Sequence, residues 1–268
     1  MPEIDLSLFI YGLLIGLGAG AIGGILAGLA GIGGGLIYVP VFYASMPGST
    51  NGMAPHVFAS LVAVIITGLF STRSHWRLKH IDHQLLIFLL PGLMVGAGLG
   101  LWSTLRLPET WILLALAGLN GWVAYDYGRK VMITPSGKIS ASILSGPIGF
   151  VSGMLGIGGG TMMVPLLRRF TALRFAVGTS AACGLLMATG AVGSNLLFEP
   201  DWPTMLGQQL SFLVGAWLGI ALILPESTGW SARLHSMISE QTMRLFLKTV
   251  FIMLASGLLI AAALSVMS

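Results

Sequence analysis

Charged side chains are what this sequence most lacks. Only 8% of its 268 residues are Asp, Glu, Lys or Arg, while 55% are hydrophobic; a soluble domain carries about 25% charged residues. Residues 6–72 contain none of the four charged types. Built as one helix, that stretch would be roughly 100 Å long, against about 30 Å for the hydrocarbon core of a bilayer. The chain therefore enters or crosses a membrane several times.

Several other features are missing, and each absence narrows the function. Cys183 is the single cysteine, so no disulfide framework exists, and its apolar surroundings indicate a small core residue. No metal-binding or catalytic motif is present, so we predict no enzyme, no metal and no cofactor. The basic residues are few and lie in short loops, which argues against a nucleic-acid partner. The N-terminus carries no basic residue, so we predict no cleaved signal peptide.

The most informative feature that is present is a duplicated motif. Residues 28–41 read GLAGIGGGLIYVPV, and residues 153–166 read GMLGIGGGTMMVPL, 125 positions later. The likeness extends to three further pairs at a slightly shorter offset: Ser60 with Ser180, Gly96 with Gly215, and Gly100 with Gly219. A glycine break at matching places of two halves points to the binding site of a transporter. We expect one membrane domain made of two repeats, residues 1–130 and 131–268.

The fold class follows from the apolar runs and from the basic residues. The runs are continuously apolar, unlike the alternating strands of a membrane barrel, which predicts an all-α polytopic membrane protein. Twelve of the thirteen Lys and Arg residues share one side only if each broken segment enters and leaves on the same side. Each repeat is then a glycine-broken, re-entrant-like helix hairpin followed by three transmembrane helices. The two repeats have inverted topology, and both termini lie outside the cell (inner) membrane.

The glycine breaks are the predicted substrate site. Glycine weakens helix and lets a ligand approach the backbone, and the helix that begins after each break directs unpaired N–H groups into it. Helix N-termini bind anions without a lysine. The alternative is that these glycines only allow close helix packing, which we expect for the pairs Gly96/Gly100 and Gly215/Gly219. The predicted substrate-binding glycines are Gly31, Gly33, Gly34, Gly35, Gly156, Gly158, Gly159 and Gly160.

Four further side chains belong to the predicted site. Ser60, Thr179 and Ser180 lie early in the spans after the breaks, where their hydroxyls either bind an oxyanion or bond back to the helix. His56 either pairs with an anion, carries a proton, or is an interfacial residue. Asp82 and Asp201 are repeat-related acids at span starts, where the helix dipole favours them, and we assign them that structural role.

A family resemblance supports the same function. The duplicated GIGGG, together with AVGTS at 176–180, FAS at 58–60 and HWRLKHID at 75–82, resembles the TauE/SafE family over roughly residues 8–265. The resemblance implies a multi-pass secondary transporter that exports a small sulfur-containing anion, sulfite or an organosulfonate. The expected partners are that anion and the lipid bilayer, with a possible homo-oligomer. In the first repeat Phe58-Ala59-Ser60 replaces the family's Gly-Thr-Ser, which favours Thr179 as a ligand. A passive anion channel, a permease of another small oxyanion, and a membrane enzyme or scaffold remain as alternatives.

Overall fold

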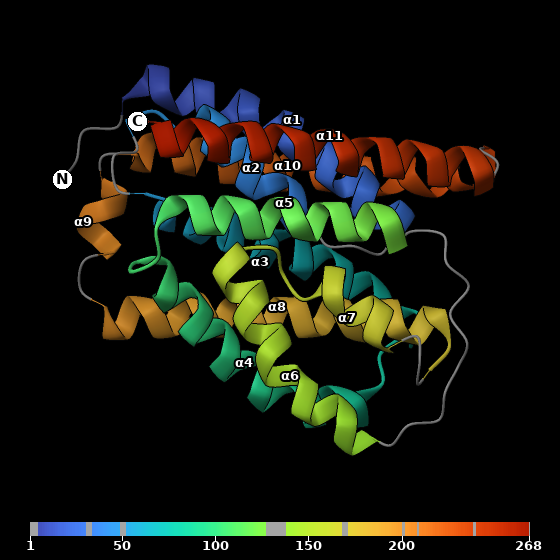
Figure 1. The fold of residues 1–268 in the computed structure, drawn as a ribbon. Helices are drawn as coiled ribbons and strands as arrows, with labels where there is room; N and C mark the ends of the chain where they lie inside the picture. Colours follow the sequence, from blue (N-terminus) through green and yellow to red (C-terminus); the bar gives the residue numbers. More distant parts are fainter. Residues whose placement is uncertain are drawn as a thin grey trace.

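The computed structural model describes residues 5–30, 34–48, 52–126, 138–167, 171–199, 202–207, 209–237 and 240–267. Over these residues the chain is helical and contains no strand, which confirms the all-α prediction (Figure 1). The helices are α1 (Leu6–Ala30), α2 (Gly35–Ser45), α3 (Ala54–Arg77), α4 (His83–Thr104), α5 (Glu109–Asp126), α6 (Lys138–Leu155), α7 (Gly160–Leu167), α8 (Leu173–Phe198), α9 (Trp202–Gly207), α10 (Leu210–Met237) and α11 (Glu240–Met267).

Six helices of the described part are long and apolar enough to cross a bilayer, as a multi-pass protein requires. They contain the spans Leu6–Ala27, Ala54–Arg77, His83–Ser103, Arg174–Phe198, Leu210–Ser227 and Lys248–Val266. The helices after the two breaks are much shorter, 11 residues in α2 and 8 in α7. Helix α1 is therefore long enough to cross by itself, whereas α2 and α7 cover only part of the hydrocarbon thickness.

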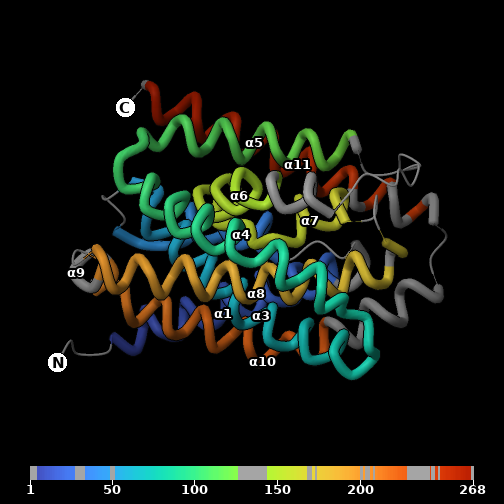
Figure 2. Tube along the Cα trace, turned by 90° about the horizontal axis from the view of Figure 1, so that it is seen from below, coloured from blue at the N-terminus to red at the C-terminus, as the bar shows by residue number. Residues whose placement is uncertain are grey.

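The centre of the bundle is formed by α3 and α8, which pack on each other. In each of their spans 61% of the residues are buried, against 22% in α11. By the duplication, α1 corresponds to α6, α2 to α7, α3 to α8, α4 to α10, and α5 to α11. The contacts between helices obey the same correspondence. The first helix of each half packs on the fourth helix of the other, α1 on α10 and α6 on α4, and α5 lies along α11 (Figures 1 and 2). The inverted relation itself stays a prediction, which this pairing supports.

Glycine lets these long helices touch backbone to backbone. A Cβ at Gly96 or Gly100 of α4 would lie 2.2 Å from the Gly146 carbonyl oxygen or 2.1 Å from that of Phe150. At Gly215 of α10 it would lie 2.2 Å from the Phe9 carbonyl oxygen. Packing is the role that we predicted for these pairs, and small residues at helix crossings are how membrane bundles achieve close contact without a hydrophobic driving force.

The bundle has two distinct ends. The terminal end, where both chain ends lie, also carries α9 and the turn from α4 to α5 (Figure 1). Arg106 lies in that turn and pairs with Glu199 at 3.8 Å. The opposite or basic end carries the turn from α3 to α4, with exposed basic side chains on Arg73, Arg77, Lys79 and Arg174.

The polar stretch between the last two spans, Leu210–Ser227 and Lys248–Val266, is largely helical. Helix α10 continues through Pro225 to Met237, and α11 begins at Glu240. Both helices are 28 residues long, about 42 Å, so they extend beyond the hydrocarbon core.

Candidate functional site

The second glycine break has a backbone that only glycine adopts readily. Gly156 and Gly158 lie at φ +65° and +66°, in the left-handed region, between the end of α6 at Leu155 and the start of α7 at Gly160. Ile157 between them is fully buried. The two left-handed glycines turn the chain sharply inside the protein, where unwound backbone is tolerated because protein surrounds it.

The described part of the first break lies directly against the second. A Cβ at Gly35, the first residue of α2, would be 2.2 Å from the Ile157 carbonyl oxygen, so the two breaks touch. Gly34 has ordinary helical angles, and its own missing side chain leaves room for the buried Tyr38 ring, 2.7 Å from where a Cβ would lie. Gly31 and Gly33 of the predicted site lie outside the described residues.

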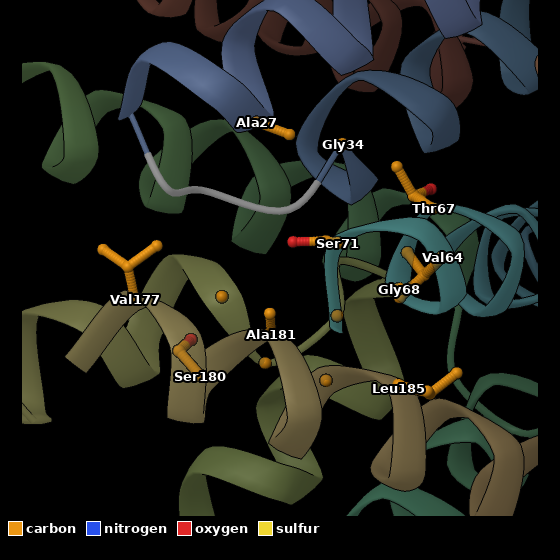
Figure 3. A pocket seen from close by; sticks show the side chains of 14 residues that line it. Ala27, Gly34, Val64, Thr67, Gly68, Ser71, Val177, Ser180, Ala181 and Leu185 are labelled. Carbon is orange, nitrogen blue, oxygen red and sulfur yellow. The ribbon is translucent and has the colours of Figure 1, made fainter. Parts of the chain in front are cut away.

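A cavity of about 50 Å³ lies beside this contact, between α3 and α8 (Figure 3). A buried water needs roughly 10–15 Å³ of such space, so the cavity holds a few waters or one small oxyanion. None of the described residues that line it is charged. The lining residues are Ala27, Gly34, Val64, Thr67, Gly68, Ser71, Gly158, Gly159, Gly160, Val177, Ser180, Ala181, Gly184 and Leu185.

The second break contributes backbone to the wall of this cavity through Gly158, Gly159 and Gly160. Gly159 and Gly160 lie at the N-terminus of α7, where the first N–H groups have no carbonyl one turn earlier in the helix. Gly184 of α8 faces them closely: a Cβ there would be 3.2 Å from the Gly159 nitrogen and 3.8 Å from that of Gly160. Absence of a side chain at position 184 thus leaves these amides open to the cavity.

Three hydroxyl groups complete the polar lining. Ser180 of α8 is fully buried, and its Oγ has no hydrogen-bond partner. In Figure 3 the Ser71 hydroxyl points from α3 into the cavity, toward the wall that carries Ser180. Thr67, one turn before Ser71, donates to the Ala63 carbonyl oxygen and lies 3.3 Å from the Tyr38 hydroxyl. An unsatisfied buried hydroxyl costs about 1–3 kcal/mol, which a bound acceptor would recover.

The other predicted side chains lie outside the cavity. Ser60 donates to the Gly156 carbonyl oxygen at 2.6 Å and thereby holds the second break. Thr179 accepts a hydrogen bond from the Asp82 backbone N–H at 2.9 Å, at the basic end of α8. The buried His56 has its Nδ1 3.2 Å from the Gly52 carbonyl oxygen and its ring against Tyr43, near the start of α3.

Two structural assignments made from the sequence are confirmed. Asp82 is the N-cap of α4, and its Oδ1 accepts from the Leu85 N–H at 3.0 Å. Cys183 is a buried core residue. Asp201 lies outside the described residues. Among the described residues, no group of three His, Cys, Asp or Glu side chains is arranged to hold a metal ion.

Thr67 and Ser71 are the residues with polar side chains in the cavity that the sequence analysis did not predict. They are four positions apart in α3, and Val64 precedes Thr67 by three, so all three share one helix face. That spacing could have been found in the sequence. A search for duplicated residues passes over it, because the matching positions in the second half are Met187 and Ala191.

Comparison with known proteins agrees with this architecture. The profile of the family described as "Sulfite exporter TauE/SafE" matches residues 16–259. A probable membrane transporter protein of Haemophilus influenzae is 31% identical over 223 residues, covering 78% of this chain and 83% of that protein. One of Bacillus subtilis is 26% identical over 282 residues, covering 94% and 97%. No solved structure matches the chain significantly.

Proposed function

Because the chain belongs to the sulfite exporter TauE/SafE family of membrane transporters, we propose that it carries a small, singly charged sulfur oxyanion out of the cell. Bisulfite or a short organosulfonate is the proposed substrate, bound in the cavity between α3 and α8. The observation that carries the proposal is an uncharged cavity lined by the open amides of Gly159 and Gly160 and by the unpartnered Ser180 hydroxyl. We place the basic end in the cytoplasm by the positive-inside rule.

The charge of the substrate follows from what the cavity offers. A helix N-terminus carries about half a positive charge, and hydroxyl and amide dipoles add to it without supplying a full charge. Such a site stabilises one negative charge better than two, because a second charge would stay largely unbalanced in a desolvated space, which is unfavourable. The volume of about 50 Å³ also suits an anion of a few heavy atoms better than a bulky one.

The proposal can be tested by flux and by binding across a pH range. The purified protein is reconstituted in sealed vesicles, and uptake of sulfite, a short alkanesulfonate and sulfate is measured with and without a proton gradient. As pH rises through the second ionisation of sulfite, the monovalent fraction falls, so apparent sulfite affinity should weaken about tenfold per pH unit. The sulfonate stays monovalent and serves as the control, with an affinity that does not follow this trend.

Two outcomes would contradict the proposal. Tighter sulfite binding at high pH, or a preference for sulfate, would mean that the site holds two charges. Absence of flux for every anion would remove the transport function itself. A passive channel is the second candidate function; it predicts flux that never saturates and is the same from both sides, which the same vesicles measure.

A further inference from the structure

The two repeats differ at their matching serines. Ser60 of α3 and Ser180 of α8 occupy equivalent positions after the two breaks, and both are fully buried. Ser60 donates to the Gly156 carbonyl oxygen of the opposite repeat's break. Ser180 has no partner and lines the cavity. One serine is therefore engaged in holding a break while its counterpart is available to a ligand.

The same difference extends to the walls around the serines. On the cavity side the wall of α8 carries Val177, Ser180 and Ala181. The equivalent residues of α3 are Val57, Ser60 and Leu61, and each of them is 0% exposed. Met187 and Ala191, the counterparts of the cavity residues Thr67 and Ser71, are also 0% exposed. Among the cavity residues, Val177, Ala181 and Ser71 are partly exposed, whereas their counterparts Val57, Leu61 and Ala191 are not, so the matching positions are packed more closely.

The cavity lies toward the basic end of the bundle. Its α3 residues Thr67, Gly68 and Ser71 fall in the second half of that helix, which leads to the turn at 78–82. Its α8 residues fall in the first half of α8. Thr179 and Gly178 at the start of α8 pack against that same turn: Thr179 accepts from Asp82, and a Cβ at Gly178 would be 2.2 Å from the His80 carbonyl oxygen.

The opposite, terminal end is closed by aromatic packing and polar contacts. Trp202 of α9 is fully buried, and its ring centre lies 4.7 Å from that of Phe58, which follows Val57 in α3. The Gln209 side chain donates to the Gly48 carbonyl oxygen at 3.3 Å, and Tyr43 donates to Glu109 at 2.5 Å. In Figure 1, α9 lies at this end beside the chain termini.

We infer that the two serines exchange roles in an alternating-access cycle, and that the structure is the state open toward the basic end. In this state Ser180 faces the substrate, while Ser60 on Gly156 and the Phe58–Trp202 stack close the terminal end. In the opposite state the stack separates, Ser60 faces the substrate and Ser180 packs away. This inference rests on the proposed transport function, and a conformational exchange between inverted repeats is how such folds move a central site from one side to the other.

The test measures thiol accessibility, which needs no substrate and no transport. In a Cys183→Ala background, single cysteines are introduced by Ala181→Cys in the cavity wall and Leu61→Cys at its counterpart. A membrane-impermeant methanethiosulfonate reagent is then applied to either side of sealed vesicles. Lys79→Cys and Leu107→Cys mark the basic and terminal sides. We expect A181C to label from the basic side and L61C to be protected.

Opening the terminal end should raise the labelling rate of one introduced cysteine and lower that of the other. Adding Trp202→Ala should raise L61C labelling from the terminal side about tenfold and lower A181C labelling from the basic side. Trp202→Phe, which keeps a stacking ring, should label as the parent does. Ser60→Ala should shift labelling in the same direction as Trp202→Ala, and Ser180→Ala should leave it unchanged.

The contrary outcomes are distinct. If both rates rise together with Trp202→Ala, the cavity is part of a continuous pore, and the exchange is wrong. If neither rate changes, the aromatic stack is packing only, and the inference also fails. Labelling is independent of flux. A protein that labels as expected but moves no sulfite would therefore support the exchange between two states and contradict the proposed function.

Discussion

Helices α3 and α8 occupy equivalent places in the two repeats, pack on each other and are equally buried, yet they contribute differently to the site. One wall of the cavity carries Thr67 and Ser71, whereas the matching positions of α8 hold Met187 and Ala191. The two matching serines also differ: the Ser180 hydroxyl has no hydrogen-bond partner, whereas the Ser60 hydroxyl donates to the Gly156 carbonyl oxygen. The two related helices therefore form one asymmetric cavity. A small ligand between them needs space beside only one of the helices at a time.

The largest effect is expected from filling the cavity at the break. Gly159→Leu should reduce transport by about 100-fold or more, because a Cβ there already lies 3.3 Å from the Gly184 Cα, and a leucine side chain would occupy the ligand's place. Flux in vesicles, normalised to inserted protein, measures this. Gly193→Leu in α8 is the matched control, since a Cβ there meets nothing within 4 Å. Equal flux in the two variants would mean that Gly159 serves helix packing and not substrate binding.

The serine pair separates binding from stability. Ser180→Ala should weaken substrate affinity at least tenfold, since a hydrogen bond to a charged group contributes roughly 1.5–3 kcal/mol, and it should raise thermal stability, because it removes a buried hydroxyl that has no partner. Ser60→Ala should instead lower thermal stability. It leaves the buried Gly156 carbonyl oxygen without its donor, which destabilises the protein by about 1–3 kcal/mol. Ligand binding and thermal unfolding in detergent give both quantities. Similar profiles for the two variants would erase the proposed difference between the helices.

The smallest effect is expected at the glycine that faces the amides. Gly184→Ala would place a methyl group 3.2 Å from the Gly159 nitrogen and should reduce affinity several-fold by covering that donor. Gly193→Ala lies in the same helix and introduces the same atom into open space, so it should bind as the parent does. The comparison is made by titration of bisulfite or sulfonate. An unchanged affinity for Gly184→Ala would mean that these amides do not contact the substrate.

Much of the fold was predictable from sequence. The uncharged stretch 6–72 leaves no alternative to burial in a bilayer, and backbone satisfaction there leaves helices. The two GIGGG motifs mark where helices must break, since each interior glycine disfavours helix by about 1 kcal/mol. In the first motif α2 begins at Gly35, and in the second the left-handed angles of Gly156 and Gly158 show why glycine is required there. Asp82 was likewise predictable, because a cap interacts with residues three positions away.

The side chains that face the ligand could not be predicted in this way. Thr179 reads as the better ligand from the sequence, but its hydroxyl accepts from Asp82, a residue 97 positions away. Ser71 lines the cavity, but its counterpart in the second half is Ala191, so the duplication did not indicate it. What the sequence by itself determined is the membrane, the helices and the place of the breaks, because these depend on neighbouring residues and on solvent. Which hydroxyl is free and which end is closed was decided only by the tertiary structure, because both depend on helix rotation and on partners distant in the chain.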